Sequence, residues 1–183
     1  MNMTPELDVV MDESFLSDLQ AREMDELRAM RSRCQSLENS LSYVRRLIQG
    51  RLDIVGGELQ RRRDGGEDGD IGELIGRLPD ILSEGSRTSG GPGSVRPPHS
   101  LEPDAAVTAQ LEAKLETVIA SADLGMAAEL DEPALTAALS GLNGLEDDVS
   151  SSRRRLHEVI DALQTEVTRR YTTGEASVEG LLG

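Results

Sequence analysis

Two long stretches of the chain carry apolar residues at alternating steps of three and four positions. The first stretch contains Leu27, Met30, Cys34, Leu37, Leu41, Val44 and Ile48, and the second contains Leu135, Ala138, Leu142, Leu145, Val149, Leu156, Val159 and Leu163. This spacing puts the apolar side chains on one narrow stripe of an α-helix, as in a coiled coil. Because each stripe needs a partner, the pattern predicts an all-α fold whose core is an antiparallel two-helix coiled coil with short accessory helices.

The composition fits this thin helical structure. Aromatic residues make up 2% of the 183 residues, which is too few to fill a thick globular core. The single Cys34 excludes an internal disulfide, and together with two His it cannot build an ordinary structural zinc site. No apolar run approaches the roughly 20 residues that span a bilayer, and the acidic N-terminus does not resemble a signal peptide. We therefore expect a cytoplasmic protein that contacts no membrane.

The formal net charge of −15 restricts the partners. A phosphate backbone would be repelled at long range, so we expect no direct DNA or RNA binding. A basic protein surface is the favoured partner. An anionic small ligand would have to be held by a local cluster of arginines, which supply 18 of the 19 basic residues.

Breaks in the apolar pattern divide the chain into segments. In chain order we expect a flexible N-terminus (1–13), a first coiled-coil helix (14–63), a short helix and a disordered Gly-, Pro- and Ser-rich linker (64–105), a second helical region (106–171) and a C-terminal tail (172–183). Gly56 and Gly57 are expected to fray or bend the first long helix. Asp131 and Pro133 are typical of a helix start and predict where the second one begins.

Polar residues beside the two stripes repeat at an offset of 108 residues. The first copy is Glu38, Ser42, Arg45, Gln49 and Asp53, and the second copy is Glu146, Ser150, Arg153, His157 and Asp161. Steps of four, three, four and four keep all five side chains of a copy on one flank of its helix. Antiparallel pairing relates the two copies, which we call the pentads, by an approximate two-fold axis. Such an arrangement suits a ligand that itself has two-fold symmetry.

The residue types in each pentad indicate the chemistry of that ligand. Arginine can grip the O6 and N7 edge of guanine or a phosphate with two hydrogen bonds. Carboxylates can accept hydrogen bonds from the N1 and N2 donors of guanine, and serine can donate to a phosphate oxygen. Guanine together with phosphate therefore satisfies the whole set.

This doubled pattern resembles the signature of the RsiG family of anti-sigma factors. The first pentad matches the family pattern at every position, and the second departs once, with His157 where the family has Gln. The resemblance implies that the ten pentad residues bind a dimer of cyclic di-GMP between the helices. It also implies that the loaded protein sequesters the sporulation sigma factor WhiG from RNA polymerase, and that it is not an enzyme. Acidic side chains that are candidates for contact with this basic partner are Asp18, Glu23, Asp25, Glu26 and Glu166.

Two other interpretations remain open from the residues alone. Charged side chains beside a heptad stripe are common in structural coiled coils, so a scaffolding protein without a nucleotide ligand is the main alternative. An enzyme is the third: Ser150, His157 and Asp161 are the residue types of a catalytic triad, but an exposed helix offers them no oxyanion donors. Cys34 is expected to be an inert core thiol, and Arg61–Arg63 a solvated helix end.

Overall fold

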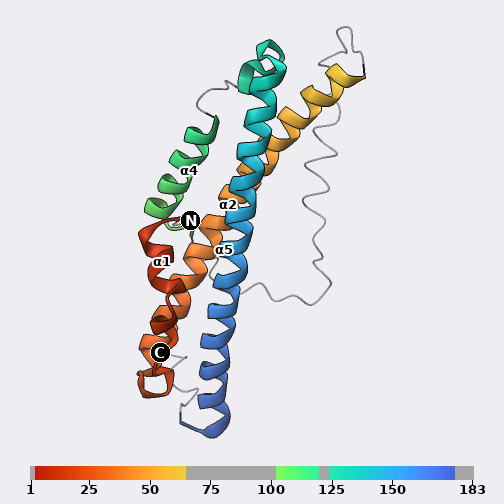
Figure 1. Cartoon of the computed structure of the whole chain (residues 1–183). Helices are drawn as coiled ribbons and strands as arrows, with labels where there is room; N and C mark the ends of the chain where they lie inside the picture. The colour runs from red at the N-terminus through yellow and green to blue at the C-terminus, as the bar shows by residue number, and fades with distance from the viewer. Residues whose placement is uncertain (1–2, 65–101, 120–123, 176–183) are drawn as a thin grey trace.

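The computed structural model describes residues 3–64, 102–119 and 124–175, and every regular element among them is helical. In chain order these elements are α1 (Pro5–Met11), the 3-10 turns η1 (Glu13–Leu16) and η2 (Leu19–Ala21), α2 (Met24–Arg63), α4 (Ala105–Ile119), the 3-10 turn η3 (Leu124–Glu129) and α5 (Glu132–Thr173). The two long helices α2 and α5 run antiparallel along the length of the molecule, and α1 and α4 pack beside them (Figure 1). The prediction of an all-α fold built on an antiparallel helix pair is confirmed.

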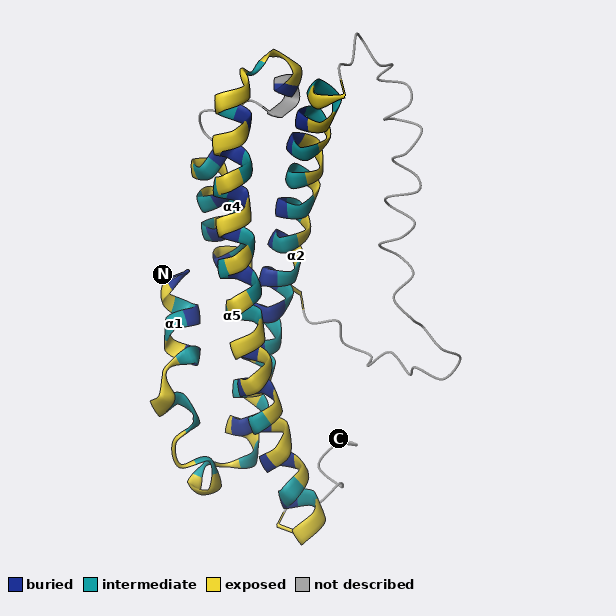
Figure 2. Ribbon diagram, turned by 45° about the vertical axis from the view of Figure 1, so that its right-hand side comes forward, coloured by how far each residue is buried: buried dark blue, intermediate teal, exposed yellow. Residues whose placement is uncertain are grey.

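The core lies where the two apolar stripes face each other. Leu41 and Val44 of α2 and Val149 and Leu156 of α5 are fully buried, and the buried positions follow the inner sides of both long helices (Figure 2). Every predicted stripe residue is buried except Met30, which is partly buried and packs against the core. Each buried Leu, Ile or Val of the stripes contributes roughly 1.5–3 kcal/mol relative to its exposure to water, so the stripes supply much of the stability of the pair.

The first long helix begins at Met24, ten residues later than the expected start at position 14. Residues 13–21 instead form η1 and η2, and between them Asp18 adopts a left-handed conformation with φ of 54°. A non-glycine residue in this conformation interrupts a right-handed helix, and Asp tolerates it better than most residues. The expected helix is therefore broken before Met24.

The N-terminal segment contains a helix where a flexible N-terminus was expected. The hydroxyl of Thr4 accepts a hydrogen bond from the backbone N–H of Leu7 at 3.3 Å, and Pro5 occupies the first turn of α1. Both features favour a helix start. Leu7 and Val10 are fully buried, and α1 packs against α5. The prediction of disorder is wrong for residues 3–13, because tertiary packing orders a helix too short to form alone.

Helix α2 continues through Gly56 and Gly57 to Arg63. The expected fraying at the two glycines is not found, since Val55 and Leu59 on either side of them are buried and hold this part of the helix in place. The second long helix starts as predicted: the Asp131 carboxylate accepts from the Ala134 N–H at 2.8 Å, and Pro133 lies in the first turn. Helix α4 begins after Asp104, whose carboxylate accepts from Ala106 and Val107, both at 3.0 Å.

Several expected features lie outside the described residues. These are the short helix near 71–82, nearly all of the linker and the last eight residues of the tail. None of the helices in the described ranges has both the length and the apolar character that a membrane crossing requires.

Candidate functional site

The arginine of each pentad contacts the carboxylate of the other. Arg45 Nε of α2 donates to Glu146 Oε1 of α5 at 2.7 Å and to Ser150 Oγ at 3.0 Å. In return, Arg153 of α5 donates through Nε and Nη2 to Glu38 Oε1 of α2 at 3.2 and 2.8 Å. The two pentads therefore face each other across the helix pair and are related by an approximate two-fold axis.

The serines complete the same arrangement on both helices. Ser42 Oγ donates to Glu38 Oε1 at 2.7 Å, and Ser150 Oγ donates to Glu146 Oε1 at 2.9 Å. Each carboxylate is thus held by a serine one turn away in its own helix and by an arginine from the opposite helix. We call these six residues the central cluster: Glu38, Ser42, Arg45, Glu146, Ser150 and Arg153.

Both carboxylates of the central cluster have a lowered pKa. Burial raises the pKa of Glu38, but the hydrogen bonds from Arg153 and Ser42 outweigh burial and bring it below its ordinary value. The same balance, with Arg45 and Ser150 as donors, lowers the pKa of Glu146. Both groups are therefore ionised at neutral pH, and the cluster contains two cations and two anions.

Part of each guanidinium in the cluster remains open to a ligand. The side chains of Arg45 and Arg153 are 35% and 25% exposed. Within the described parts of the chain, both Nη groups of Arg45 and Nη1 of Arg153 form no hydrogen bond. These N–H groups can donate to an acceptor from solvent while the carboxylates fix the orientation of the guanidinium planes.

The other four pentad residues lie outside the central cluster. Asp53 and Asp161 are each about 17 Å from the two-fold axis along their helices, in opposite directions, at 1.5 Å per residue. Both are exposed, and Gln49 is partly buried. The side chains of Gln49, Asp53 and Asp161 form no hydrogen bond or ion pair with any residue in the described ranges 3–64, 102–119 and 124–175. His157 reaches inward, with its Nε2 at 3.5 Å from Glu38 Oε1. The structure thus brings six of the ten predicted residues together, places His157 beside Glu38, and spaces the other three along the same flank.

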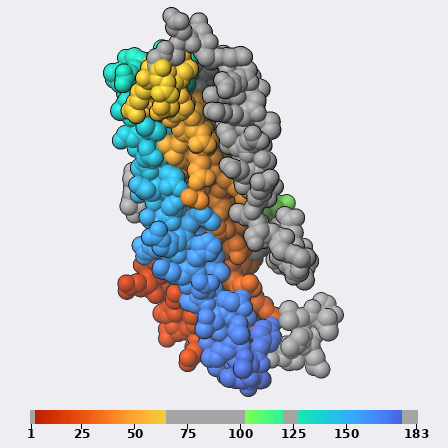
Figure 3. Space-filling model, turned by 90° about the vertical axis from the view of Figure 1, so that its right-hand side faces the viewer, coloured from red at the N-terminus to blue at the C-terminus, as the bar shows by residue number. Residues whose placement is uncertain are grey.

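The accessory helices cover the opposite face of the helix pair. Ser36 and Ser40 of α2 donate to the backbone carbonyls of Glu102 and Asp104 before α4, at 2.7 and 3.2 Å. These serines are two positions from Glu38 and Ser42, about 200° around the helix. On α5, Arg155 likewise donates to the carbonyl of Met11 at the end of α1, at 3.1 Å. Figure 3 views α2 and α5 side by side, with α4 almost entirely hidden behind them. No described helix covers the pentad face.

Sequence reasoning missed a second duplicated set of residues at the ends of the long helices. Glu58, Arg61 and Arg62 near the end of α2 recur as Glu166, Arg169 and Arg170 near the end of α5, again 108 positions later. We call these two sets the end clamps. Comparing the two helices beyond the pentads at the same offset would have revealed them.

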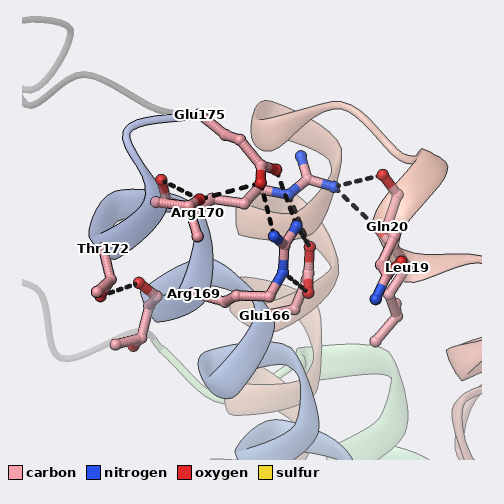
Figure 4. Close-up of polar contacts among 9 residues, drawn as sticks. Leu19, Gln20, Glu166, Arg169, Arg170, Thr172 and Glu175 are labelled. Atoms are coloured by element: carbon pink, nitrogen blue, oxygen red, sulfur yellow. Dashed lines mark hydrogen bonds and ion pairs between the residues drawn. The ribbon is translucent and has the colours of Figure 1, made fainter.

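Each end clamp ties the end of one long helix to the turn before the other. Arg62 Nη2 donates to the carbonyls of Ala128 and Leu130 at 3.1 and 2.6 Å, just before α5. Arg170 Nη2 donates to the carbonyls of Leu19 and Gln20 at 2.8 and 3.3 Å, just before α2 (Figure 4). The prediction that Arg61–Arg63 is only a solvated helix end is therefore wrong for Arg62.

The carboxylate of each end clamp is held by two arginines. Hydrogen bonds from Arg61, and then from Arg62, lower the pKa of Glu58 to about 2. Hydrogen bonds from Arg169 and Arg170 lower the pKa of Glu166 to about 2. Glu166 is also buried, so it is not available for contact with a partner as the sequence suggested.

Neither Cys34 nor Ser150, whose side chains could act as nucleophiles, is arranged for catalysis. Cys34 is fully buried, and burial raises the pKa of its thiol to about 11, as expected of an inert core cysteine. The hydroxyl of Ser150 donates to Glu146 and not to His157, so the residues with triad chemistry do not form a nucleophile and base pair.

A comparison with protein families found one family whose model matches both segments of the chain that contain the pentads. The model of the RsiG-like family matches residues 13–82 and 121–182, which is more than two thirds of the chain. The matched segments contain both pentads and both end clamps. A comparison with curated proteins gave no match.

Proposed function

Because the chain belongs to the RsiG-like family, a family of regulatory anti-sigma factors and not of enzymes, we propose that it captures a WhiG-type sigma factor while holding a dimer of cyclic di-GMP. Capture withholds the sigma factor from RNA polymerase, and a fall in the nucleotide concentration releases it to transcribe sporulation genes. In this proposal the protein works in the cytoplasm and the nucleotide forms part of the binding surface.

The observation that carries the proposal is the reciprocal pairing of the two pentads. Arg45 with Glu146 and Arg153 with Glu38 present the same donors twice on one face, which no described helix covers. The free N–H groups of Arg45 and Arg153 match the acceptors of a guanine edge or a phosphate. The donor set therefore fits a ligand that combines guanine and phosphate with two-fold symmetry.

The geometry divides the pentad residues into two roles. Glu38, Glu146 and the two serines already bond within the cluster, so we assign them to positioning the arginines. Asp53 and Asp161 carry exposed carboxylates that can accept from the N1 and N2 donors of guanine. Because these two lie on opposite sides of the axis, they suit guanines at the two ends of an extended ligand. Gln49 and His157 lie between the cluster and these carboxylates.

The overall charge supports a sigma factor as partner. A sigma factor exposes basic surfaces that otherwise meet DNA, and this chain carries a net charge of −15. Complementary potentials would accelerate and orient their association. Asp18, Glu23, Asp25 and Glu26, at and just before the start of α2, are exposed and available for such contacts.

Capture of a WhiG-type sigma factor as a function of cyclic di-GMP concentration tests the proposal. We expect capture to rise with the nucleotide for the wild-type chain and to weaken at least about tenfold for Arg45→Ala and Asp161→Ala, since a charged hydrogen bond contributes roughly 1.5–3 kcal/mol. Arg33→Ala, an arginine on the opposite flank of α2, should behave as wild type. Capture that does not depend on the nucleotide concentration would favour a scaffolding coiled coil instead. Capture that is unchanged in the double variant Arg45→Ala, Asp161→Ala would favour the same alternative.

A further inference from the structure

Two arginines outside the pentads are also 108 positions apart, and their side chains have no partner among the described residues. Arg46 and Arg154 directly follow the pentad arginines, are separated by 108 positions and are both exposed. With the residues that the structure describes, neither side chain forms a hydrogen bond or an ion pair. Duplicated arginines elsewhere in the fold, those of the central cluster and the end clamps, all have carboxylate partners.

Arg46 and Arg154 lie next to the central cluster, on the side of each long helix that faces away from the other long helix. Each follows the cluster serine of its own helix, Ser42 or Ser150, by four positions, which is about 40° around the helix and about 6 Å along it. Both are about 7 Å from the two-fold axis along their helices, one on each side. A ligand that covers the central cluster is therefore within reach of both guanidinium groups.

Arg46 and Arg154 place unpaired positive charge next to the central cluster, whereas the exposed carboxylates of Asp53 and Asp161 lie farther away, about 17 Å from the two-fold axis. The central cluster alone is neutral, because Glu38 and Glu146 compensate Arg45 and Arg153. Arg46 and Arg154 add two positive charges, and neither forms an ion pair with a described carboxylate. A compensated guanidinium still donates well to a neutral guanine edge, whereas an uncompensated one attracts a phosphate with its full charge.

We propose that Arg46 and Arg154 bind the phosphates of the cyclic di-GMP dimer and set its affinity, while Arg45 and Arg153 recognise guanine. This inference rests on the proposed function and adds to it two binding residues and a division of labour. It explains how an acidic chain can hold an anionic ligand on a cluster that is itself neutral.

Titration of cyclic di-GMP into the full chain with its sigma factor, at several NaCl concentrations, tests the inference. The double variant Arg46→Gln, Arg154→Gln should bind the nucleotide at least about tenfold more weakly than wild type in 0.1 M NaCl. The difference should shrink toward 1 M NaCl, because the Debye length falls from about 10 Å to about 3 Å. Replacing both arginines by Lys should keep most of the salt dependence, since the charge is retained.

The double variant Arg33→Gln, Arg63→Gln is the matched control. It removes the same total charge, two arginines, but both from α2: Arg33 on the opposite flank and Arg63 about 27 Å from Arg45 along the helix. This variant should bind as wild type does. Equal losses in both double variants, or no loss in the Arg46 and Arg154 variant, would overturn the inference and leave the proposed function standing. A wild-type chain that binds no cyclic di-GMP at any salt concentration would overturn both.

Discussion

Glu38 and Arg153 form a buried contact of the kind that fixes how two helices align. The Glu38 side chain is 9% exposed and accepts from Arg153 at 2.8 Å. An apolar stripe alone does not fix the register, because sliding one helix by seven residues restores similar apolar contacts. The repeat in the sequence predicted that the pentads lie together, but not which side chains bond to which. That pairing depends on the register, which only the three-dimensional structure provides.

A double-mutant cycle on Glu38 and Arg153 measures this contact. We expect a coupling energy of about 1–2 kcal/mol from urea unfolding of Glu38→Ala, Arg153→Ala and the double variant, since the carboxylate is buried and doubly hydrogen-bonded. The comparison pair is Arg51 and Glu116, which also join two helices at 2.7 Å, but with Glu116 62% exposed. Its coupling should stay below about 0.5 kcal/mol. Equal coupling in the two pairs would contradict the role given to the central cluster.

The helices differ in how well their ends can be read from the sequence. The start of α5 was predictable because Asp131 and Pro133 are local signals that act within one turn. The start of α2 was not, because an Asp at position 18 permits the left-handed conformation but does not require it. Helix α1 was missed for a third reason: seven residues fold only against the face of α5 that buries Leu7 and Val10.

Replacing a glycine of the long helices by alanine is expected to change the stability differently at different positions. A Cβ at Gly56 or Gly57 meets no atom within 4 Å, so Gly→Ala at either should raise the stability by about 1 kcal/mol. A Cβ at Gly141 would lie 2.8 Å from Val118 Cγ1, so Gly141→Ala should gain less or lose stability as α4 is pushed aside. Thermal unfolding followed by circular dichroism measures all three. The packing described here would be wrong if Gly141→Ala stabilised the chain as much as Gly56→Ala.

The two long helices carry the same polar sets 108 positions apart, and the end clamps join each long helix to the turn before the other. The pentads alone predicted this two-fold relation from the sequence. Arg62 and Arg170 bond to backbone carbonyls, which carry no sequence signal, so their role became visible only once the turns before α2 and α5 were placed.

Acid should loosen the end clamps within a defined range. An unfolded glutamate takes up its proton near pH 4.3, whereas Glu58 and Glu166 in the folded chain do so only near pH 2. The unfolded state thus binds more protons, and the clamp contribution is present above about pH 4.3 and is lost as the pH falls toward 2. The melting temperatures of wild type and of Glu58→Gln, Glu166→Gln should therefore differ at pH 6 and converge toward pH 2.

Glu158→Gln, which removes the same kind of charge at an exposed position outside the end clamps, is the control variant for the acid experiment. A constant gap between wild type and the clamp variant from pH 6 to pH 2 would show that the two carboxylates do not stabilise the fold through their charge.

The number of nucleotides held by one chain tests the central claim most directly, because the two pentads are expected to form a single site. Native mass spectrometry of the chain with its sigma factor should detect two cyclic di-GMP molecules bound together. Arg45→Ala or Arg153→Ala alone should remove both, since each arginine is positioned by the opposite helix. A complex that retains one nucleotide after either change, or a wild-type complex that contains none, would contradict the account.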